Sequence, residues 1–283
     1  MVAGLYRRDI EKMVHTRTLT DYDANANDFD HFRQPNAYIK QKLIDAFSVR
    51  GGPILSVGCG TGQYEAILSE KLEIIGIDRS NAMIRKAKER IPNAILGDMT
   101  TLPFANDSIL GAYFMQSLHH VGANLNIGVH QRNESRKTVL RQTLSLISQG
   151  PIFIIQRDPS QNQAVWFWKY FPKALEIKLM IQPKVEMLVE WLERFGVKNV
   201  TAEAVHDPMS PGFFDPQAPL DPRFRRSFSD FSYLTDHEIQ VGIQELLRAN
   251  RDGSVLDEIN ASKLRFSEIG GTVFVVSGEK HHL

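Results

Sequence analysis

Three glycines alternate with two small residues directly after a short apolar run, in the segment Ile54-Leu55-Ser56-Val57-Gly58-Cys59-Gly60-Thr61-Gly62. Glycine tolerates positive φ and lets the main chain approach a ligand closely. A second apolar run, residues 74–77, ends on Asp78. A carboxylate at the end of such a strand can accept hydrogen bonds from ribose hydroxyls. The pattern therefore predicts a strand, a glycine turn, a helix and a second strand that together bind a nucleoside.

The spacing of the glycines narrows the class of nucleoside. A dinucleotide site has Gly-x-Gly-x-x-Gly, in which the third glycine allows close packing of a helix on a strand beneath a pyrophosphate. Here one residue separates Gly58 from Gly60, and one separates Gly60 from Gly62. This spacing disfavours an NAD-dependent dehydrogenase.

The chain resembles the class I S-adenosylmethionine (SAM)-dependent methyltransferases, whose first motif is an apolar strand ending in Gly-x-Gly-x-Gly. Further segments resemble the motifs of that family in the same order: Gly97-Asp98-Met99, Leu102-Pro103-Phe104, Asp107-Ser108 and the stretch Ala112-Tyr113-Phe114-Met115-Gln116-Ser117-Leu118-His119-His120. The resemblance implies SAM as the cofactor and methyl transfer as the activity. Within the superfamily, the branch of small-molecule enzymes of ubiquinone and natural-product biosynthesis is the most similar.

The resemblance also assigns roles to residues. Asp78 would hold the ribose, although an Asp at a strand–helix junction could simply cap the helix. Asp98 and Met99 would flank the adenine, Met83 would pack on the adenine or in the core, and Arg33 would pair with the cofactor carboxylate. The residues expected to contact the cofactor are Tyr22, Arg33, Gly58, Cys59, Gly60, Gly62, Asp78, Arg79, Met83, Gly97, Asp98, Met99, Gln116 and His119.

One position departs from the family pattern. The family usually has Asp or Glu just before the glycine turn, where it supports the methionine end of the cofactor, and this chain has Ser56. A serine hydroxyl can accept a hydrogen bond but carries no charge. We therefore expect either weaker cofactor affinity or a compensating residue elsewhere.

Candidate catalytic residues are few. His119 follows the fourth strand, where the methyl group would be presented, and a histidine there could act as a general base or simply line the cofactor. His15 and Tyr22 are weaker catalytic candidates. His206 and Asp207 are adjacent but lack a third ligand nearby, so no metal site is expected.

The acceptor site is expected in segments rich in aromatic residues. Aromatic walls suit an apolar or planar acceptor, and the residues expected to line this site are Trp166, Trp168, Tyr170, Phe213 and Phe214. The basic residues Arg223, Arg225 and Arg226 either grip an acidic group on the acceptor or form a solvated face. The attacked atom could be oxygen, nitrogen, carbon or sulfur.

Bulk properties limit the classes of function. Lys plus Arg and Asp plus Glu both number 33, without long runs of one sign, which argues against a nucleic-acid partner. The single cysteine, Cys59, excludes an internal disulfide. No apolar stretch is long enough for a membrane span, and the first residues lack the apolar region of a signal peptide. We expect a cytoplasmic protein, a monomer or homodimer, whose partner is a small-molecule acceptor.

The order of apolar runs predicts an α/β fold: a Rossmann-like, doubly wound, seven-stranded sheet with an antiparallel last strand and helical, aromatic lid insertions. We expect five alternating strands at 54–57, 73–77, 94–96, 110–115 and 151–156, then strands at 197–205 and 271–277. The expected organisation is a helical arm over the cofactor (1–50), the SAM-binding core (51–160), an aromatic and helical lid segment (161–195), the completing strands (196–206 and 270–280) and a lid insertion (207–269).

Two other functions stay open. A SAM-binding protein without transfer activity is one, because Ser56 departs from the family pattern. An RNA or protein methyltransferase is the other, although the balanced charge disfavours RNA and no Asn-Pro-Pro-Tyr motif follows the fourth strand.

Overall fold

Seven strands form one sheet in the order β3-β2-β1-β4-β5-β7-β6. The structure is a computed structural model that describes residues 22–48, 51–123, 125–206 and 212–281. Neighbouring strands from β1 to β5 are parallel, and β7 is antiparallel to both β5 and β6. The predicted sheet with an antiparallel last strand is thus confirmed. The strands are β1 (Pro53–Val57), β2 (Glu73–Asp78), β3 (Ala94–Leu96), β4 (Gly111–Met115), β5 (Gly150–Gln156), β6 (Lys198–Val205) and β7 (Val273–Lys280).

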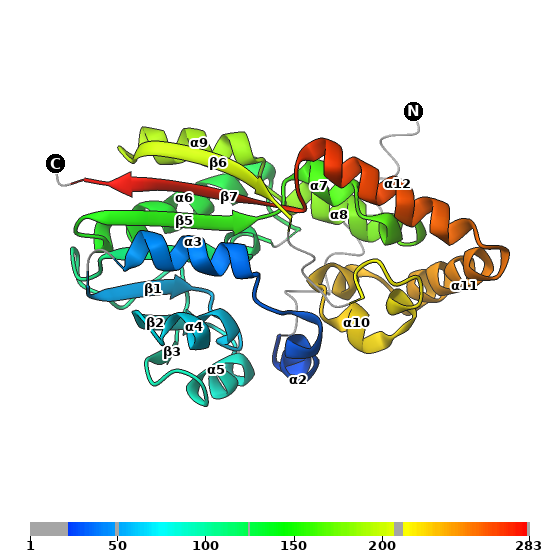
Figure 1. Cartoon of the computed structure of the whole chain (residues 1–283), viewed down its shortest axis with the longest axis horizontal. Helices are drawn as coiled ribbons and strands as arrows, with labels where there is room; N and C mark the ends of the chain where they lie inside the picture. Colours follow the sequence, from blue (N-terminus) through cyan, green and yellow to red (C-terminus); the bar gives the residue numbers. More distant parts are fainter. Residues whose placement is uncertain (1–21, 49–50, 124, 207–211, 282–283) are drawn as a thin grey trace.

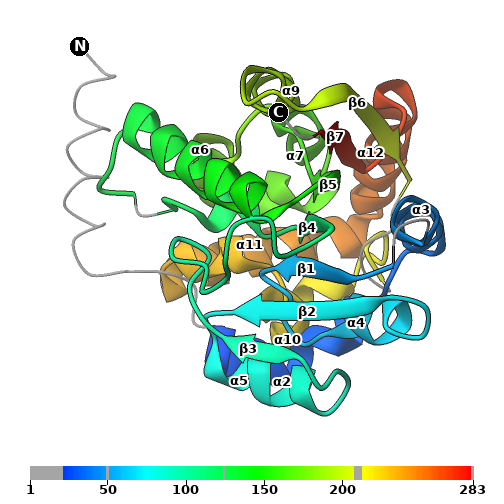
Figure 2. The ribbon, with the colours of Figure 1, turned by 90° about the vertical axis from the view of Figure 1, so that its left-hand side faces the viewer.

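Both faces of the sheet are covered by helices, which explains why its central strands are apolar throughout. Side chains alternate between the faces: Leu55 and Val57 pack with helices α6 and α9, whereas Ile54 packs with α3 on the opposite face. Figure 2 shows α6 and α3 on the two sides of the sheet. Asn36 and Ser80 cap the helices that follow them, as their residue types predict. The helices flanking the sheet are α3 (Ala37–Phe47), α4 (Gln63–Leu68), α5 (Asn81–Lys88), α6 (Val129–Leu146) and α9 (Val185–Arg194).

A second group of helices lies beyond the carboxyl ends of the parallel strands (Figure 1). It has a hydrophobic core of its own, in which the ring of Phe167 contacts several other aromatic rings. We call this group the helical layer. Its members are α7 (Pro159–Gln163), the 3-10 helix η3 (Trp166–Tyr170), α8 (Pro172–Ile181), η4 (Ala218–Leu220), α10 (Pro222–Arg226), η5 (Ser229–Tyr233), α11 (Asp236–Asp252) and α12 (Ser254–Ile269).

The helical layer is more regular than the sequence predicts. We expect one helix over 235–248 between the last two strands; the structure has α11, which Thr235 and Glu238 cap, and then α12 after a left-handed Gly253. The composition of 207–269 conceals α12, because its exposed face carries apolar residues such as Leu264. The insertion is thus mostly helix that packs on the aromatic segment after β5.

Helix α2 (Tyr22–Phe32) connects the two parts of the molecule (Figure 1). Its residue Ala26 packs with Met83 of α5 beside the sheet. Its last residue, Phe32, belongs to the core of the helical layer, edge-on to Phe224. The helix is therefore placed to couple the layer to the sheet.

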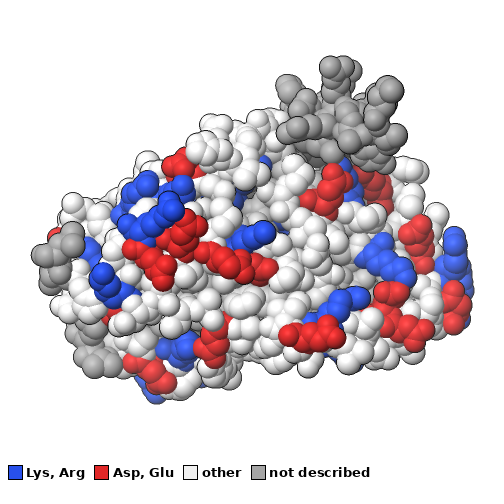
Figure 3. Space-filling view, turned by 90° about the horizontal axis from the view of Figure 1, so that it is seen from above, with Lys and Arg blue, Asp and Glu red and all other residues white. Residues whose placement is uncertain are grey.

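Charges of both signs are interspersed over the face drawn in Figure 3. Of the helices in the described part of the chain, none is long and apolar enough to cross a membrane. Within that same part, no three His, Cys, Asp or Glu side chains gather so as to hold a metal ion.

Candidate functional site

A cavity of about 320 Å³ lies between the sheet, α2 and the helical layer. On the sheet side, it is lined by the glycine turn after β1, the end of β2, residues 97–100 and the segment after β4. On the other side it is lined by residues of α2, α8 and η5. The strands β1 and β4 are neighbours at the point where the strand order reverses, which is where open α/β sheets bind ligands.

The glycine turn has the backbone that its sequence requires. Gly58 and Gly60 have φ values of 81° and 57° and line the cavity together with Cys59. A Cβ on Gly58 would lie 2.5 Å from Cβ of Ser117, so only glycine fits there. Gly62 does not line the cavity; it begins α4 with φ 77°, and a Cβ there would press on the backbone of Ala87. Its place is in the packing of α4 on α5.

Asp78 ends β2 at the wall of the cavity. One carboxylate oxygen accepts a hydrogen bond from the backbone N–H of Gly60 at 2.9 Å, and the other accepts one from that of Ser80 at 2.9 Å. Burial raises the pKa of Asp78, and these two hydrogen bonds oppose that rise. Each oxygen can accept a second hydrogen bond, so the carboxylate is fixed in place with capacity left for two hydroxyls.

The next wall of the cavity comes from the loop after β3 and from α5. Gly97, Asp98 and Met99 line it together with Arg79 and Met83. Asp98 is exposed, and its Oδ1 accepts hydrogen bonds from the backbone and the hydroxyl of Thr100 at 2.8 Å each. Met83 is buried against Ala26, as the core interpretation predicts, and it also lines the cavity, so packing on the adenine stays a prediction.

A buried carboxylate stands beside Ser56, where the family pattern would have one. Glu65 of α4 is 1% exposed and lines the cavity. Its Oε1 accepts hydrogen bonds from the hydroxyls of Ser56 at 2.5 Å and Tyr113 at 2.8 Å. Burial raises the pKa of Glu65 while these hydrogen bonds lower it. The chain thus supplies, from the following helix, the acid that β1 lacks. Sequence reasoning missed Glu65, although it lies one helical turn after the last glycine of the motif.

The segment after β4 brings Gln116 and His119 to the cavity. Gln116 has φ 53°, a left-handed conformation that is uncommon for a non-glycine residue. Among the described residues, neither Nε2 of Gln116 nor Nδ1 of His119 has a hydrogen-bond partner. Burial holds the pKa of His119 well below its usual range, and His120, Lys178, Arg136 and Arg33 lower it further. A neutral His119 of low basicity fits the lining role and not that of a general base.

Two residues of the cavity wall carry no signal in the sequence. Lys178 of α8 and Asp230 of η5 form an ion pair of 2.7 Å, and both are buried. In the sequence Lys178 is one of two lysines of α8, and Asp230 stands in an irregular stretch. Only the tertiary fold brings them together.

Phe29 of α2 and Arg33, which directly follows that helix, close one side of the cavity. The Arg33 guanidinium donates to the backbone oxygen of Ser227 at 2.9 Å and lies 4.5 Å from the ring centre of Phe228. At the other end, Asp30 accepts hydrogen bonds from the hydroxyl of Thr61 in the glycine turn and from Arg90. Arg33 is thus at the cavity, as predicted, and α2 is tied to the glycine turn.

The structure places the five predicted acceptor-binding aromatics elsewhere. Trp166, Trp168, Tyr170 and Phe213 are buried in the core of the helical layer, and Phe214 packs against that core. None of the five is among the described residues that line the cavity. Trp166 also donates its indole N–H to the backbone oxygen of Phe213 at 2.8 Å. These side chains hold the layer together because a layer separate from the sheet needs a core of its own.

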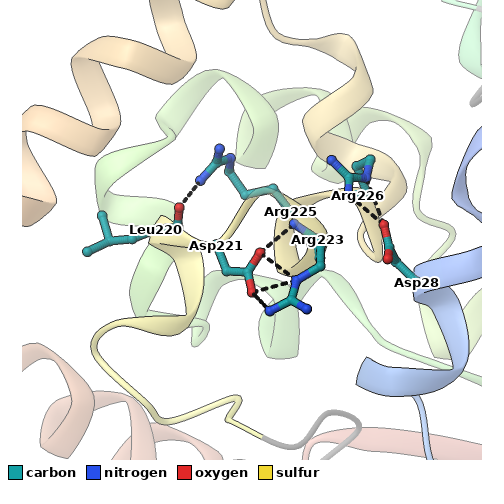
Figure 4. Close-up of polar contacts among 6 residues, drawn as sticks. All are labelled: Asp28, Leu220, Asp221, Arg223, Arg225 and Arg226. Carbon is teal, nitrogen blue, oxygen red and sulfur yellow. Dashed lines mark hydrogen bonds and ion pairs between the residues drawn. The ribbon is translucent and has the colours of Figure 1, made fainter.

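The basic residues near α10 form contacts within the protein (Figure 4). Arg223 pairs with Asp221, and Arg225 donates to the backbone oxygens of Pro219 and Leu220. Arg226 donates two hydrogen bonds to one oxygen of Asp28 on α2, at 2.6 and 3.0 Å. None of the three arginines is among the residues lining the cavity, so gripping an acceptor is not their observed arrangement.

The side chains of two predicted catalytic residues lie outside the part of the chain that the structure describes. His15 lies outside the described residues. Tyr22 begins α2, but its side chain also lies outside the described part.

Comparison with known proteins assigns the sheet and its glycine turn to a family. Residues 54–132 match the family model described as a methyltransferase domain. This stretch contains the glycine turn, Asp78, Asp98 and the segment after β4, on a sheet with the strand order given above. The segment 54–132 is thus similar to a methyltransferase domain, as the resemblance to the class I SAM-dependent methyltransferases predicts.

Solved structures of other methyltransferases share this fold. One is described as a methyltransferase from an antibiotic biosynthesis pathway of Anabaena variabilis; it is 19% identical, with 87% of this chain and 99% of that chain covered and a TM-score of 0.67. Another is phosphoethanolamine N-methyltransferase 2 of Haemonchus contortus in complex with SAM, at 14% identity, 95% and 61% coverage and a TM-score of 0.54.

Relatives by sequence match only a part of this chain. The O-methyltransferase rstn1 of Aspergillus nomiae is 37% identical over 84 residues, which are 26% of this chain and 37% of that protein. A 37.1 kDa protein in a transposon of Streptomyces fradiae is 35% identical over 92 residues, and the chain covers 27% of its length. The chain thus spans well under half the length of both curated relatives.

Proposed function

We propose that this chain transfers a methyl group from SAM to a small-molecule acceptor. The observation that carries the proposal is the position of Asp78, fixed by Gly60 and Ser80 at the wall of a cavity. The same cavity continues to charged residues of the helical layer, Lys178 and Asp230. One cavity can therefore hold a nucleoside at the sheet and a second ligand beneath the layer.

The residues of the sheet side fit SAM. Asp78 would accept the ribose hydroxyls, and Met83 and Met99 would pack beside the adenine, with Asp98 at its edge. Gly60, where an added Cβ would meet only a ring atom of Phe29 at 4.0 Å, leaves room for the amino-acid part of the cofactor. Glu65 and Asp78 offer negative charge to a cofactor that carries a sulfonium and an ammonium group, because opposite charges attract strongly where water is excluded.

Bound SAM supplies an activated methyl group with its own leaving group. The protein's part is orientation and the exclusion of water. Helix α2 and η5 cover the cavity, with Phe29 and Phe228 in its wall. Tyr64 lines the cavity as well. These three rings take the place of the five aromatic residues predicted from the sequence as the surface available to an acceptor.

We further propose an apolar or aromatic metabolite of secondary or cofactor metabolism as the acceptor. The rings of Phe29, Tyr64 and Phe228 in the wall support this proposal. It also agrees with the similarity of the chain to an O-methyltransferase and to a methyltransferase of an antibiotic biosynthesis pathway. A cytoplasmic location and a monomeric or homodimeric state stay predictions.

Calorimetry with SAM and with its product S-adenosylhomocysteine tests the cofactor assignment, and we expect micromolar or tighter binding. Mass spectrometry of acceptor mixtures, incubated with SAM and the chain, would then detect the gain of one methyl group. Absence of cofactor binding would refute the proposal. Binding without transfer to any small acceptor would favour the alternative of a SAM-binding protein, and transfer to RNA or protein would favour the other alternative.

A further inference from the structure

The ion pair of Lys178 and Asp230 is unusual for its burial. The Lys178 side chain is 9% exposed and the Asp230 side chain 1% exposed, and Nζ of Lys178 lies 2.7 Å from Oδ2 of Asp230. Desolvation of two charges offsets most of their attraction, so an ion pair inside a protein is weak support for stability. Both residues line the cavity. The position of this pair in the cavity wall indicates a role in ligand binding rather than in stability.

The second oxygen of Asp230 is the informative atom. Within the described part of the chain, Oδ1 of Asp230 is buried and has no hydrogen-bond partner. A buried carboxylate oxygen without a donor is costly, and such groups in native proteins are normally satisfied. Asp230 lines the cavity, so a ligand in the cavity can provide the missing N–H or O–H donor.

The charges around this pair have one sign. Burial lowers the pKa of Lys178, the pairing with Asp230 opposes this effect, and Arg157 and Arg33 lower the pKa further. His119 and His120 lie close enough to be affected by Lys178 and are held neutral, with the pKa of His120 lowered to about 3. The other cations that act on these histidines are Arg79 and Arg136. Negative charge developing on a ligand here would be stabilised, and positive charge would be repelled.

The helix α6 fixes the pair next to the segment after β4. Arg136 of α6 donates to the backbone oxygen of His119 at 3.1 Å and to that of Ile181, the last residue of α8. The helix that carries Lys178 is therefore fastened to the segment that presents His119 to the cavity. Lys178 therefore lies close enough to the segment after β4 to lower the pKa of His119.

From this geometry we infer that Lys178 and Asp230 bind and activate an acidic hydroxyl of the acceptor, a phenol or an enol, for methylation on oxygen. This inference rests on the proposed function. Asp230 Oδ1 accepts the hydrogen bond of the hydroxyl and then its proton, and Lys178 neutralises the oxygen that loses it. Transfer of the proton to Asp230 replaces the carboxylate anion beside Lys178 by the phenolate or enolate anion. Transfer of the proton to His119 would instead create a further cation in a site that already holds several.

The atoms and electrons of the step balance with SAM as the methyl donor. The O–H bond breaks and the proton passes to Asp230, from which solvent later removes it. The acceptor oxygen forms a bond to the methyl carbon as the carbon–sulfur bond breaks, and the electron pair of that bond stays on sulfur as a neutral thioether. An aliphatic alcohol is too weak an acid for a carboxylate base, and an ammonium group would be repelled by the surrounding cations.

The ionisation of a bound phenol tests the inference without methyl transfer. The probe is nitrophenol with its nitro group para to the hydroxyl, whose anion absorbs visible light, titrated with pH on the chain saturated with S-adenosylhomocysteine. We expect the phenol to ionise about one pH unit lower when bound than when free, which corresponds to about tenfold tighter binding of the anion. Lys178→Met should abolish this shift, and the conservative Lys178→Arg should keep most of it.

The outcomes separate the inference from the proposed function and from a structural role. If nitrophenol fails to bind, or if Lys178→Met shows the wild-type shift, the inference is overturned even though S-adenosylhomocysteine binds. If S-adenosylhomocysteine itself does not bind, the proposed function fails first. The single variant leaves Asp230 buried without its cationic partner and could fail to fold. The double variant Lys178→Met with Asp230→Asn removes both charges of the pair, so it keeps the comparison possible in that case. We expect the double variant to bind S-adenosylhomocysteine normally and to lose the shift, and an unaltered shift in it refutes the inference.

Discussion

The hydroxyl of Ser56, on β1, donates a hydrogen bond of 2.5 Å to Oε1 of Glu65, on α4. A carboxylate of the helix thus lies beside the strand position of Ser56, where the resemblance leads us to expect an acid, and it lines the cavity. Tyr113 of β4 donates to the same oxygen at 2.8 Å. Glu65 is therefore held rigidly by two strands, and we predict that it supports the ammonium end of the cofactor.

The first prediction is that Glu65→Gln weakens binding of S-adenosylhomocysteine about tenfold or more, because a hydrogen bond to a charged group loses its charge. The glutamine keeps the shape and can still accept from Ser56 and Tyr113. Binding of methylthioadenosine, which lacks the amino-acid end, should change little. Calorimetry with both ligands measures the two effects.

A relocated acid provides the control for this prediction. The double variant Ser56→Asp with Glu65→Gln puts the carboxylate back on the strand and should recover most of the affinity for S-adenosylhomocysteine. Equal losses for both ligands in Glu65→Gln would instead mean that Glu65 only maintains the fold of the glycine turn.

Asp78 gives the second prediction. Asp78→Asn keeps one oxygen for the Gly60 or Ser80 N–H but removes the charge and one acceptor. We expect about tenfold or greater loss of affinity for both S-adenosylhomocysteine and methylthioadenosine, because both carry the ribose. Asp98→Asn serves as the comparison, since Asp98 is exposed and its loss should cost less. An unchanged affinity in Asp78→Asn would remove the ribose assignment.

The sequence predicts the cofactor half of the site and not the acceptor half, for a physical reason. The glycine turn, Asp78 and the caps Asn36 and Ser80 are local features, in which neighbouring residues decide the backbone. The pair of Lys178 and Asp230 joins residues 52 positions apart, so only packing of α8 on η5 creates it. Glu65 was missed for the same reason, because only the packing of α4 on β1 brings its carboxylate next to Ser56.

Aromatic residues show a second limit. A run such as Trp166-Phe167-Trp168 has the same composition whether it lines a ligand or fills a core. The sheet needs α2 and the helical layer to close its cavity, and the layer needs a core before it can close anything. The tryptophans and most phenylalanines of these segments pack in that core, and Phe29, Tyr64 and Phe228 line the cavity.

The third prediction follows from that arrangement. Trp166→Phe should lower the free energy of unfolding by about 1–3 kcal/mol, because it removes buried volume and leaves the backbone oxygen of Phe213 without its donor. Denaturant unfolding measures this loss. Affinity for S-adenosylhomocysteine should stay within about twofold, since Trp166 is remote from the cavity wall. A large change in acceptor KM at unchanged stability would return Trp166 to the acceptor site.

Arg226 and Arg223 give the fourth prediction. The pair of Arg226 with Asp28 is partly exposed, so Arg226→Gln should change the free energy of unfolding by less than about 1 kcal/mol. Hydrogen exchange in α10 should nevertheless become faster, because this contact fastens α10 to α2. Arg223 pairs with Asp221 outside the cavity. The variant Arg223→Gln should therefore leave the KM for the acceptor unchanged. A raised KM in Arg223→Gln would show that this side chain reaches the acceptor after all.

The fifth prediction concerns pH. Burial and nearby cations lower the pKa of His120 from its ordinary 6.5 to about 3, so the unfolded chain binds a proton here more readily than the folded chain does. The free energy of unfolding therefore rises with pH across this interval, and it falls as pH drops from about 6.5 toward 3. Burial raises the pKa of Glu65, so Glu65 has the opposite effect: its contribution to the free energy of unfolding falls as the pH rises above the ordinary pKa of a glutamate. His120→Gln should thus lose less stability than wild type between neutral pH and about pH 5, in urea unfolding at each pH. Parallel curves for the two proteins would mean that His120 titrates normally in the folded chain.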